Sequence, residues 1–271
     1  MQIEMIIAFW VILIFGVPHG VFDIVFLKQI ATRLYPKQSF GLWVTLVVSY
    51  LLLVGAVVYL WWIFPFIMMV LFFLISTLHF GDYGRLKHFR EWSQIVATGG
   101  LITIVLPLIH WNAVSPIVQQ LVFNHIVTFE MILRLAACVW ILCLCRYFKC
   151  AWKEHLDNEH CIFLLTLLVV VVLPPIWSFL IYFCGYHAPR HIHTLLRKNP
   201  GLLRENKYLL IVTCGVVWLS GMTGYWFLNH HLMQYHALVP LIFVGLFALT
   251  VPHIVLVDLI GSSHLGVRER K

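Results

Sequence analysis

The sequence predicts an all-α fold, a polytopic integral membrane helical bundle with about eight hydrophobic segments and seven to nine crossings. Of its 271 residues, 62% are hydrophobic and only 11% are charged, whereas soluble domains are about half apolar and a quarter charged. The mean hydropathy is +0.93. Apolar runs of bilayer length, or nearly so, recur along the chain, and about 20 apolar residues suffice for a helix to cross a membrane.

The expected elements follow from these runs, taken in order along the chain. They lie at 5–27, 40–62, 65–80, 94–110, 134–150, 161–187, 208–228 and 236–260. A semi-polar stretch at 114–133 could be re-entrant, interfacial or buried within the bundle. Its Glu130 and Arg134 are spaced to pair on a helix. Because no linker, repeat or soluble region interrupts the runs, residues 1–271 are expected to form a single transmembrane helical domain.

Prolines mark where the expected helices change course. Pro174 and Pro175 should kink or break the run at 161–187. Pro189 removes a backbone donor and favours a helix start or a kink at its position. Pro18 predicts a bend in the first run, with a close approach of the backbone at the glycine two residues later.

The basic residues indicate how the chain is oriented, because Lys and Arg are enriched in cytoplasmic loops. They gather in 28–39, 81–93, 188–207 and the C-terminal tail, and they are missing before the first run and from 229–235. We therefore expect a multi-pass protein of the cell inner membrane, with the N-terminus outside and the C-terminus cytoplasmic. Eight simple crossings would put both termini on one side, so the sequence leaves seven and nine open. The net charge of +7 arises from these loops and indicates no nucleic-acid partner.

Histidines stand out against this apolar background, because ionisable side chains within a membrane are costly and usually functional. His187 and His191 close the run at 161–187. Since they are four residues apart, they share one face of a helix, whereas His193 would face away. This pair is the first candidate for a metal site.

Three more histidines occupy similar settings, and two of them follow a proline: His19, His79 and His253. With the expected orientation, four of the five lie toward the cytoplasmic ends of their helices, and His253 lies in the middle or inner half of the last one. Ligands of one ion must reach the same depth, because a histidine nitrogen lies about 2.0–2.1 Å from its metal. We therefore expect these histidines to converge on one metal ion.

The donor set narrows the choice of metal. Neutral imidazoles suit Fe(II), Cu, Zn and Ni, and the absence of a thiolate pair in the runs argues against a structural zinc site. Histidines alone leave the positive charge of the ion uncompensated, and carboxylates beside them would also orient the rings. Three of the eleven acids follow these histidines by three to five residues: Asp23, Asp82 and Asp258.

Most of the fifteen histidines are expected to be bystanders, because a lone membrane histidine usually forms hydrogen bonds between helices. They lie in expected loops, at helix ends or in the semi-polar stretch: His88, His110, His125, His155, His160, His230, His231, His236 and His264. His193 is expected to join them.

Taken together, the histidine motifs resemble those of the Brp/Blh family of membrane-bound β-carotene 15,15′-dioxygenases. The motifs are Pro-His-Gly-x-x-Asp at 18–23, His-Phe-Gly-Asp at 79–82, Tyr-His-x-x-Arg-His at 186–191 and Pro-His at 252–253. The resemblance spans most of the chain in the same order. It implies oxidative cleavage of β-carotene at its central 15,15′ double bond with O₂, giving two all-trans-retinal molecules, and a functional link to a microbial rhodopsin.

The resemblance also implies which residues form the site. Its non-haem Fe(II) would be held by four histidines, carried onto His19, His79, His187 and His191. His253 is unassigned and could be a fifth ligand, a supporting residue or part of the substrate pocket. Three further residues are expected beside the iron: Asp23, Asp82 and Tyr186. The rod-like apolar substrate would enter from membrane lipid into a tunnel with apolar and aromatic walls.

Two alternative hypotheses stay open from the sequence. One is another histidine-box membrane oxygenase, of the desaturase or hydroxylase kind, although the chain has a His-x-x-x-His pair at 187–191 and no His-x-x-His-His box. The other is a non-enzymatic membrane protein that binds metal, haem or retinoid, for which more intramembrane acids would be usual. Iron content together with O₂-dependent loss of carotenoid colour would separate these hypotheses.

Overall fold

The computed structural model of the protein describes residues 2–81, 89–151, 158–231 and 238–256. Within these ranges the chain is helical almost throughout and has no strand, which confirms the all-α membrane bundle. The chain divides into two compact units, Met1–Leu60 with Phe183–Lys271, and Trp61–Tyr182. We call them the first unit and the second unit. The expectation of a single domain stays a prediction.

The first unit begins with one long helical rod whose winding changes twice. Its parts, in order, are α1 (Gln2–Val11), the π-helix η1 (Ile12–Gly16), the 3₁₀-helix η2 (Val17–Phe22) and α2 (Asp23–Leu34). Pro18 stands in the first turn of η2, where its missing N–H interrupts the regular helical ladder. Gly16 allows close packing at the same place, since a Cβ there would collide with the ring of Phe183. The bend predicted at Pro18 is therefore a tightening of the helix, and the close approach expected at Gly20 is wrong, since nothing lies within 4 Å of a Cβ there.

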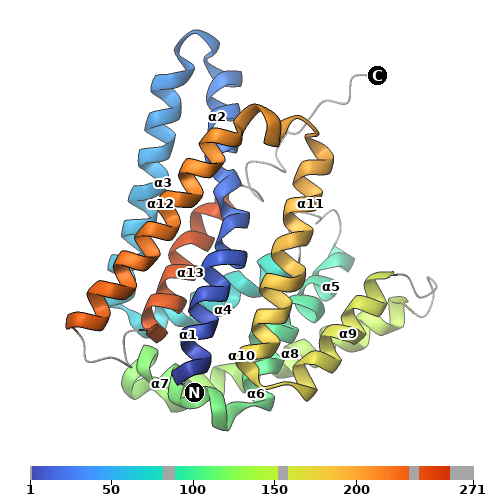
Figure 1. Ribbon diagram of the computed structural model, residues 1–271. Coiled ribbons are helices and arrows are strands. Elements are labelled where there is room, and N and C mark those ends of the chain that lie inside the picture. Colours follow the sequence, from blue (N-terminus) through green and yellow to red (C-terminus); the bar gives the residue numbers. More distant parts are fainter. Residues whose placement is uncertain (1, 82–88, 152–157, 232–237, 257–271) are drawn as a thin grey trace. The chain divides into compact units, whose positions relative to one another are not determined.

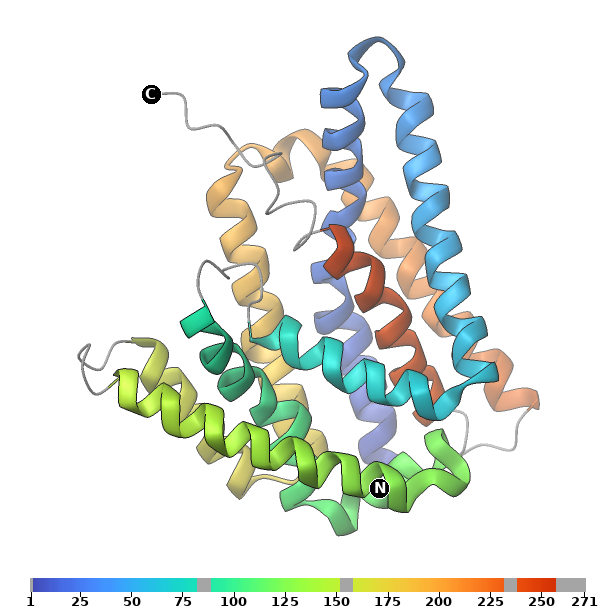
Figure 2. The ribbon, with the colours of Figure 1, turned by 180° about the vertical axis from the view of Figure 1, so that it is seen from behind.

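Four further α-helices complete the described part of the first unit. They are α3 (Ser39–Ile63), which follows the short 3₁₀-helix η3 (Pro36–Gln38), α11 (Ala188–Lys198), α12 (Leu202–His231) and α13 (Leu238–Ile254). Figures 1 and 2 show α3 returning beside α2 as a hairpin, with α12 and α13 alongside the rod. The indole N–H of Trp43 donates to the carbonyl of Ile24 (3.2 Å) and joins α3 to α2.

A core cluster of the first unit lies where η2 and α2 meet α11 and α12. Its buried members are Val21, Phe22, Val25, Leu195, Leu202 and Leu210. Because lipid tails are as apolar as these side chains, packing contacts and hydrogen bonds hold membrane helices together. Two such bonds fasten α12 to the rod: Trp218 donates to the carbonyl of Leu13 (2.9 Å), and Lys28 donates to Asn206 (3.2 Å).

The second unit consists of helices that follow one another along the chain. They are α4 (Pro65–Phe80), α5 (Phe89–Gly100), the π-helix η5 (Leu101–Val105), α6 (Leu106–Ile109), α7 (Trp111–Val122), the 3₁₀-helix η6 (Phe123–His125), α8 (Ile126–Ala151), α9 (Asn158–Val172) and α10 (Pro175–Leu180). The long α8 packs along α5 (Figure 2). Gly99 lets α4 approach α5, since a Cβ there would collide with the carbonyl of Thr77. The hydroxyls of Thr77 and Thr103 share a hydrogen bond of 2.6 Å.

The predicted proline break in the run at 161–187 is confirmed. Helix α9 ends at Val172, and α10 begins at Pro175. Proline cannot donate to the helical ladder, and it also disfavours the α conformation of the residue before it, so a proline pair ends one helix and starts the next.

The expected division between 114–133 and 134–150 is wrong. The α-helix is interrupted at η6 instead, where Phe123 has a φ of 51°. The rest of the semi-polar stretch continues into α8. Phenylalanine rarely adopts a positive φ, so the sequence carries no signal for this break. Inside α8, Arg134 donates to Glu130 at 2.6 Å, as their spacing predicts.

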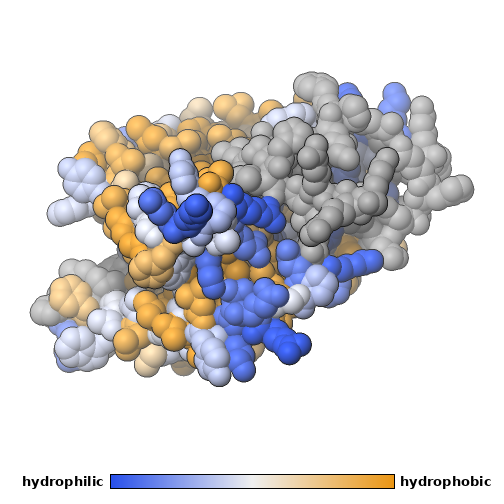
Figure 3. Space-filling view, turned by 90° about the horizontal axis from the view of Figure 1, so that it is seen from above, coloured by the Kyte–Doolittle hydropathy of each residue, from blue (hydrophilic) through white to orange (hydrophobic). Residues whose placement is uncertain are grey.

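Five helical segments are long and apolar enough to cross a membrane by their length and composition: Ile3–Leu34, Pro36–Ile63, Trp92–Ile109, Trp111–Lys149 and Leu202–Phe227. Shorter apolar helices span Pro65–Phe80, His160–Val172 and Leu238–Ile254. In Pro36–Ile63 and Leu202–Phe227 only 6% of the most apolar window is buried, so these helices turn apolar side chains outward, as lipid-facing helices do. Figure 3 shows hydrophilic residues gathered on one part of an end face. The number of crossings and the orientation stay predictions.

Candidate metal centre

Four histidines of the first unit meet in its interior, and we call them the histidine cluster: His19 in η2, His187 at the end of the π-helix η7 (Ile181–His187), His191 in α11 and His253 in α13. The ring centroid of His19 lies 5.7 Å from those of His187 and His191 and 5.2 Å from that of His253. The rings of His191 and His253 are 5.1 Å apart. His19 therefore contacts all three other rings of the cluster.

The junction of η7 and α11 places two of these rings. Pro189 is the second residue of α11, where its missing N–H costs no helical bond. The helix therefore restarts at Ala188 after the wide π turn, as the proline predicts. His187 and His191 stand on either side of this restart, one turn apart, and both rings contact His19.

The orientation of the His19 ring is fixed from two directions. Its Nδ1–H donates to the carbonyl of Gly16 three residues earlier, which leaves the lone pair on Nε2. The ring of Phe183 meets His19 edge-on, with centroids 5.5 Å apart, and stacks on His187 at 6.0 Å. A histidine whose second nitrogen donates to a backbone carbonyl is in the tautomer suited to bind a metal through the first.

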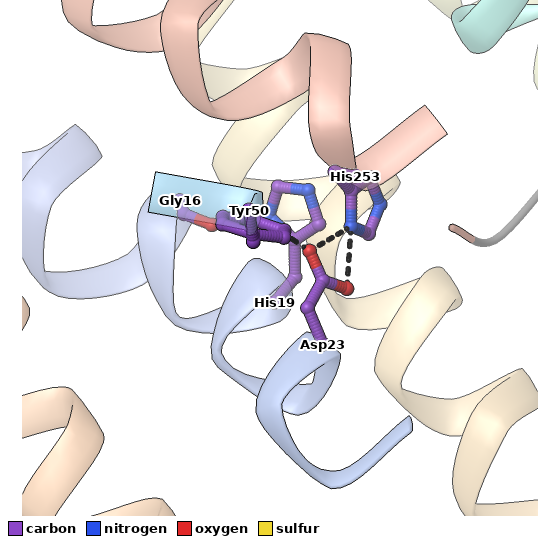
Figure 4. Close-up of polar contacts among 5 residues, drawn as sticks. All are labelled: Gly16, His19, Asp23, Tyr50 and His253. Carbon is purple, nitrogen blue, oxygen red and sulfur yellow. Dashed lines mark hydrogen bonds and ion pairs between the residues drawn. The ribbon is translucent and has the colours of Figure 1, made fainter. Parts of the chain in front are cut away.

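Asp23 connects the cluster to α3. Its carboxylate accepts a hydrogen bond from Nδ1–H of His253, with distances of 2.8 and 3.0 Å to its two oxygens, and another from the hydroxyl of Tyr50 at 2.9 Å. Figure 4 shows the side chains of His253 and Tyr50 converging on this carboxylate, with the His19 ring beside that of His253. Asp23 and His253 are each only 3% exposed. The sequence places Asp23 one turn after His19, but the residue that it binds is His253.

The donor set of this cluster fits a metal ion. Imidazoles that share one ion at about 2.0–2.1 Å have ring centroids roughly 4.5–6 Å apart, and the four distances within the cluster lie in that interval. A ring nitrogen of His19 and one of His187 lie within 4.8 Å of each other. The donors that the cluster offers are imidazole nitrogens, which suit borderline transition metals.

His79 belongs to the second unit. It lies in the last turn of α4 and is buried, and its ring is 5.9 Å from that of Phe80. The hydroxyl of Tyr182 donates to the carbonyl of Phe80 (3.3 Å), which holds this end of α4. The imidazole of His79 could supply a nitrogen to a metal ion.

The other residues singled out from the sequence have separate surroundings. Tyr186 accepts a hydrogen bond from Arg190, whose guanidinium also lies 5.5 Å from the ring centre. His193 is exposed on α11. Asp82 and Asp258 lie outside the described residues, as do four of the expected bystanders: His88, His155, His236 and His264.

The described bystander histidines form contacts away from the cluster. His110 bonds to the carbonyl of Val170 through Nε2 (2.8 Å). Aromatic rings pack on three others: Phe66 on His125, Tyr147 on His160 and Trp226 on His230. His231 ends α12, and its side chain is not described.

Sequence reasoning missed Gly16, Tyr50 and Phe183. Tyr50 offered a signal, since a phenol in the middle of an apolar run needs a hydrogen-bond partner. Gly16 and Phe183 offered none, because their role depends on how η1 packs against η7.

Apolar helices long enough to cross a membrane, together with a cluster of buried and half-buried imidazoles, define a helical membrane protein with a candidate metal centre. The chain belongs to the beta-carotene 15,15′-dioxygenase family, whose model matches residues 10–261. This confirms the resemblance carried by the motifs, and it makes the protein an enzyme of the oxidoreductase class.

One relative is similar over nearly its whole length. The beta-carotene 15,15′-dioxygenase of uncultured marine bacterium 66A03 is 29% identical over 267 residues, which cover 95% of this chain and 94% of that protein. No solved structure matches the chain. Family membership removes the non-enzymatic hypothesis and favours the dioxygenase over another histidine-box oxygenase.

Proposed function

We propose that this protein cleaves β-carotene with O₂ at the central 15,15′ double bond and releases two molecules of all-trans-retinal. Overall, the C15=C15′ bond breaks and each carbon gains one oxygen atom, so the reaction needs no further reductant. Family membership over residues 10–261 is the observation that carries this proposal, and the name of the relative agrees with it.

The proposed cofactor is Fe(II), held by His19, His79, His187 and His191. The cluster in the first unit supports three of these ligands, since both other rings lie 5.7 Å from that of His19. His79 is proposed from its motif at the end of α4 and from its burial. When bound, Fe(II) would supply the redox chemistry that lets O₂ react with a carbon–carbon double bond.

The residues of the chain would hold and shield this chemistry. Gly16 fixes the tautomer of His19, so that Nε2 is the nitrogen offered to the ion. Phe183 covers His19 and His187 with an apolar ring, which would exclude water and favour a polyene over a polar substrate. No residue is required to transfer a proton, because the overall reaction moves none.

The surroundings of the site suit a substrate dissolved in the membrane. β-Carotene is a rod of about bilayer thickness, and the outward apolar faces of Pro36–Ile63 and Leu202–Phe227 indicate that lipid surrounds the protein. We propose that the substrate enters from this lipid. The enzyme would lie in the cell inner membrane with its C-terminus in the cytoplasm, and it would supply retinal to a microbial rhodopsin.

Expression in β-carotene-producing bacteria tests the proposal. The expected outcome is O₂-dependent bleaching of the cells, with retinal in their extracts. Cells that carry His187→Ala should neither bleach nor yield retinal. Cells with His193→Ala, whose side chain is exposed on the same helix, should bleach as the wild type does. Longer apocarotenals in place of retinal would mean cleavage away from the centre, and unchanged colour would contradict the proposal.

A further inference from the structure

Asp23 is a buried carboxylate that ties together three elements of the first unit. It opens α2 and accepts hydrogen bonds from Tyr50 of α3 (2.9 Å) and from His253 of α13 (2.8 Å). A buried carboxylate is stable only when hydrogen bonds or a positive charge compensate it. The two hydrogen-bond donors drawn in Figure 4 provide this compensation for Asp23.

The bond from His253 to Asp23 fixes that imidazole completely. The carboxylate can only accept, so Nδ1 of His253 carries a proton, and the other ring nitrogen, Nε2, is buried. The ring is then held between two others, 5.2 Å from His19 and 5.1 Å from His191. Both contacts are edge-to-face, with interplanar angles of 87° and 63°.

We propose that His253, anchored by Asp23 and Tyr50, is a positioning residue of the metal centre. Its ring fixes the orientations of His19 and His191, and Asp23 places a carboxylate beside the cluster. Residues that orient the ligands of a metal without binding it typically raise metal affinity about 10–100-fold. This role rests on the proposed function, since it needs a metal at His19 and His191.

Purified variants loaded with Co(II) test the role without any substrate. His253→Phe keeps a ring of similar size but loses the anchor, and Asp23→Asn removes the charge. We expect Co(II) to bind about 10–100-fold more weakly to both variants in competition with a chelator, and we expect the Co(II) absorption spectrum to change. Tyr50→Phe leaves the bond to His253 in place, so it should weaken Co(II) binding measurably but by less than about tenfold.

His193→Phe is the matched control, because this exposed histidine lies two residues from His191 on the same helix. It should bind Co(II) as the wild type does. If His253→Phe binds Co(II) with wild-type affinity and spectrum, the ring only fills space and the proposal is wrong. If it binds no Co(II) at saturation, as expected of His19→Ala, then His253 is a ligand and the positioning role is also wrong.

Three further outcomes keep the test decisive. If His253→Phe and Asp23→Asn aggregate in size-exclusion chromatography, Tyr50→Phe decides the test. Wild-type Co(II) affinity and spectrum in Tyr50→Phe would then overturn the role of the anchor. A wild-type protein that binds Co(II) but forms no retinal when loaded with Fe(II) would overturn the proposed function alone. A wild-type protein that does both, with His253→Phe equal to it, would overturn the positioning role alone.

Discussion

His19 has three imidazoles around it, with ring centroids 5.2 Å, 5.7 Å and 5.7 Å away. Replacing it by alanine removes the ring on which the others converge. We expect His19→Ala to lower the iron content of the purified protein about 100-fold or more and to abolish retinal formation, measured by metal analysis and extraction. His230→Ala, which removes an exposed ring that packs on Trp226, should change neither. Wild-type iron content in His19→Ala would contradict the assigned site.

Gly16 offers a second test at the level of single residues. A Cβ there would collide with the ring of Phe183, which itself packs on His19 and His187. We expect Gly16→Ala to lower the free energy of unfolding by about 1–3 kcal/mol and to weaken metal binding, because Phe183 must move. Gly55→Ala is the control, since nothing lies within 4 Å of its added Cβ, and thermal unfolding in detergent should show equal or higher stability. Equal stabilities of the two variants would refute the close packing.

The sequence locates all four residues of the cluster but not their pairing. His19, His187 and His253 could be selected because polar rings within apolar runs are unusual. The partner of Asp23 could not, because the carboxylate lies one turn from His19 along the chain and binds a histidine 230 residues away. Only tertiary packing decides between two such partners.

At the level of elements, the approach of α4 to α5 depends on Gly99. A Cβ at this position would collide with the main-chain carbonyl of Thr77, and main chain cannot yield as a side-chain tip can. Gly99→Ala should therefore destabilise the protein by about 1–3 kcal/mol, even though alanine favours helices by about 1 kcal/mol. Gly41→Ala, which meets nothing within 4 Å, should gain that preference. Thermal unfolding of the two variants in the same detergent compares them, and a stable Gly99→Ala would refute the close contact.

The hydrophobic runs predict where most helices lie, because burial in lipid requires apolar residues over a fixed length. They do not predict how the helices wind. Local packing determines the winding of the π-helices η1 and η7 and of the 3₁₀-helix η2. Such packing leaves no periodic pattern in the sequence. The same holds for the turn at Phe123, whose positive φ opposes the preference of its own side chain.

At the level of the whole molecule, orientation is the property that the basic residues predict. Arg33 and Lys37 are exposed at the turn between α2 and α3, where the rule of positive cytoplasmic loops places them inside. A green fluorescent reporter fused to the C-terminus should fluoresce, because such reporters fold in the cytoplasm. Alkaline phosphatase fused to the same end should be inactive. The reverse pattern would invert the predicted topology.

The bond between Asp23 and His253 joins residues that are 230 positions apart. This separation along the chain means that the two residues are synthesised at different times. At about 5–20 residues per second, a ribosome needs roughly 10–50 s to pass from one to the other. Throughout that interval the first helix is already made while the imidazole that anchors its carboxylate does not yet exist. The histidine cluster is thus among the last parts of the protein to form, and its complete set of rings can receive a metal only after α13 has been synthesised.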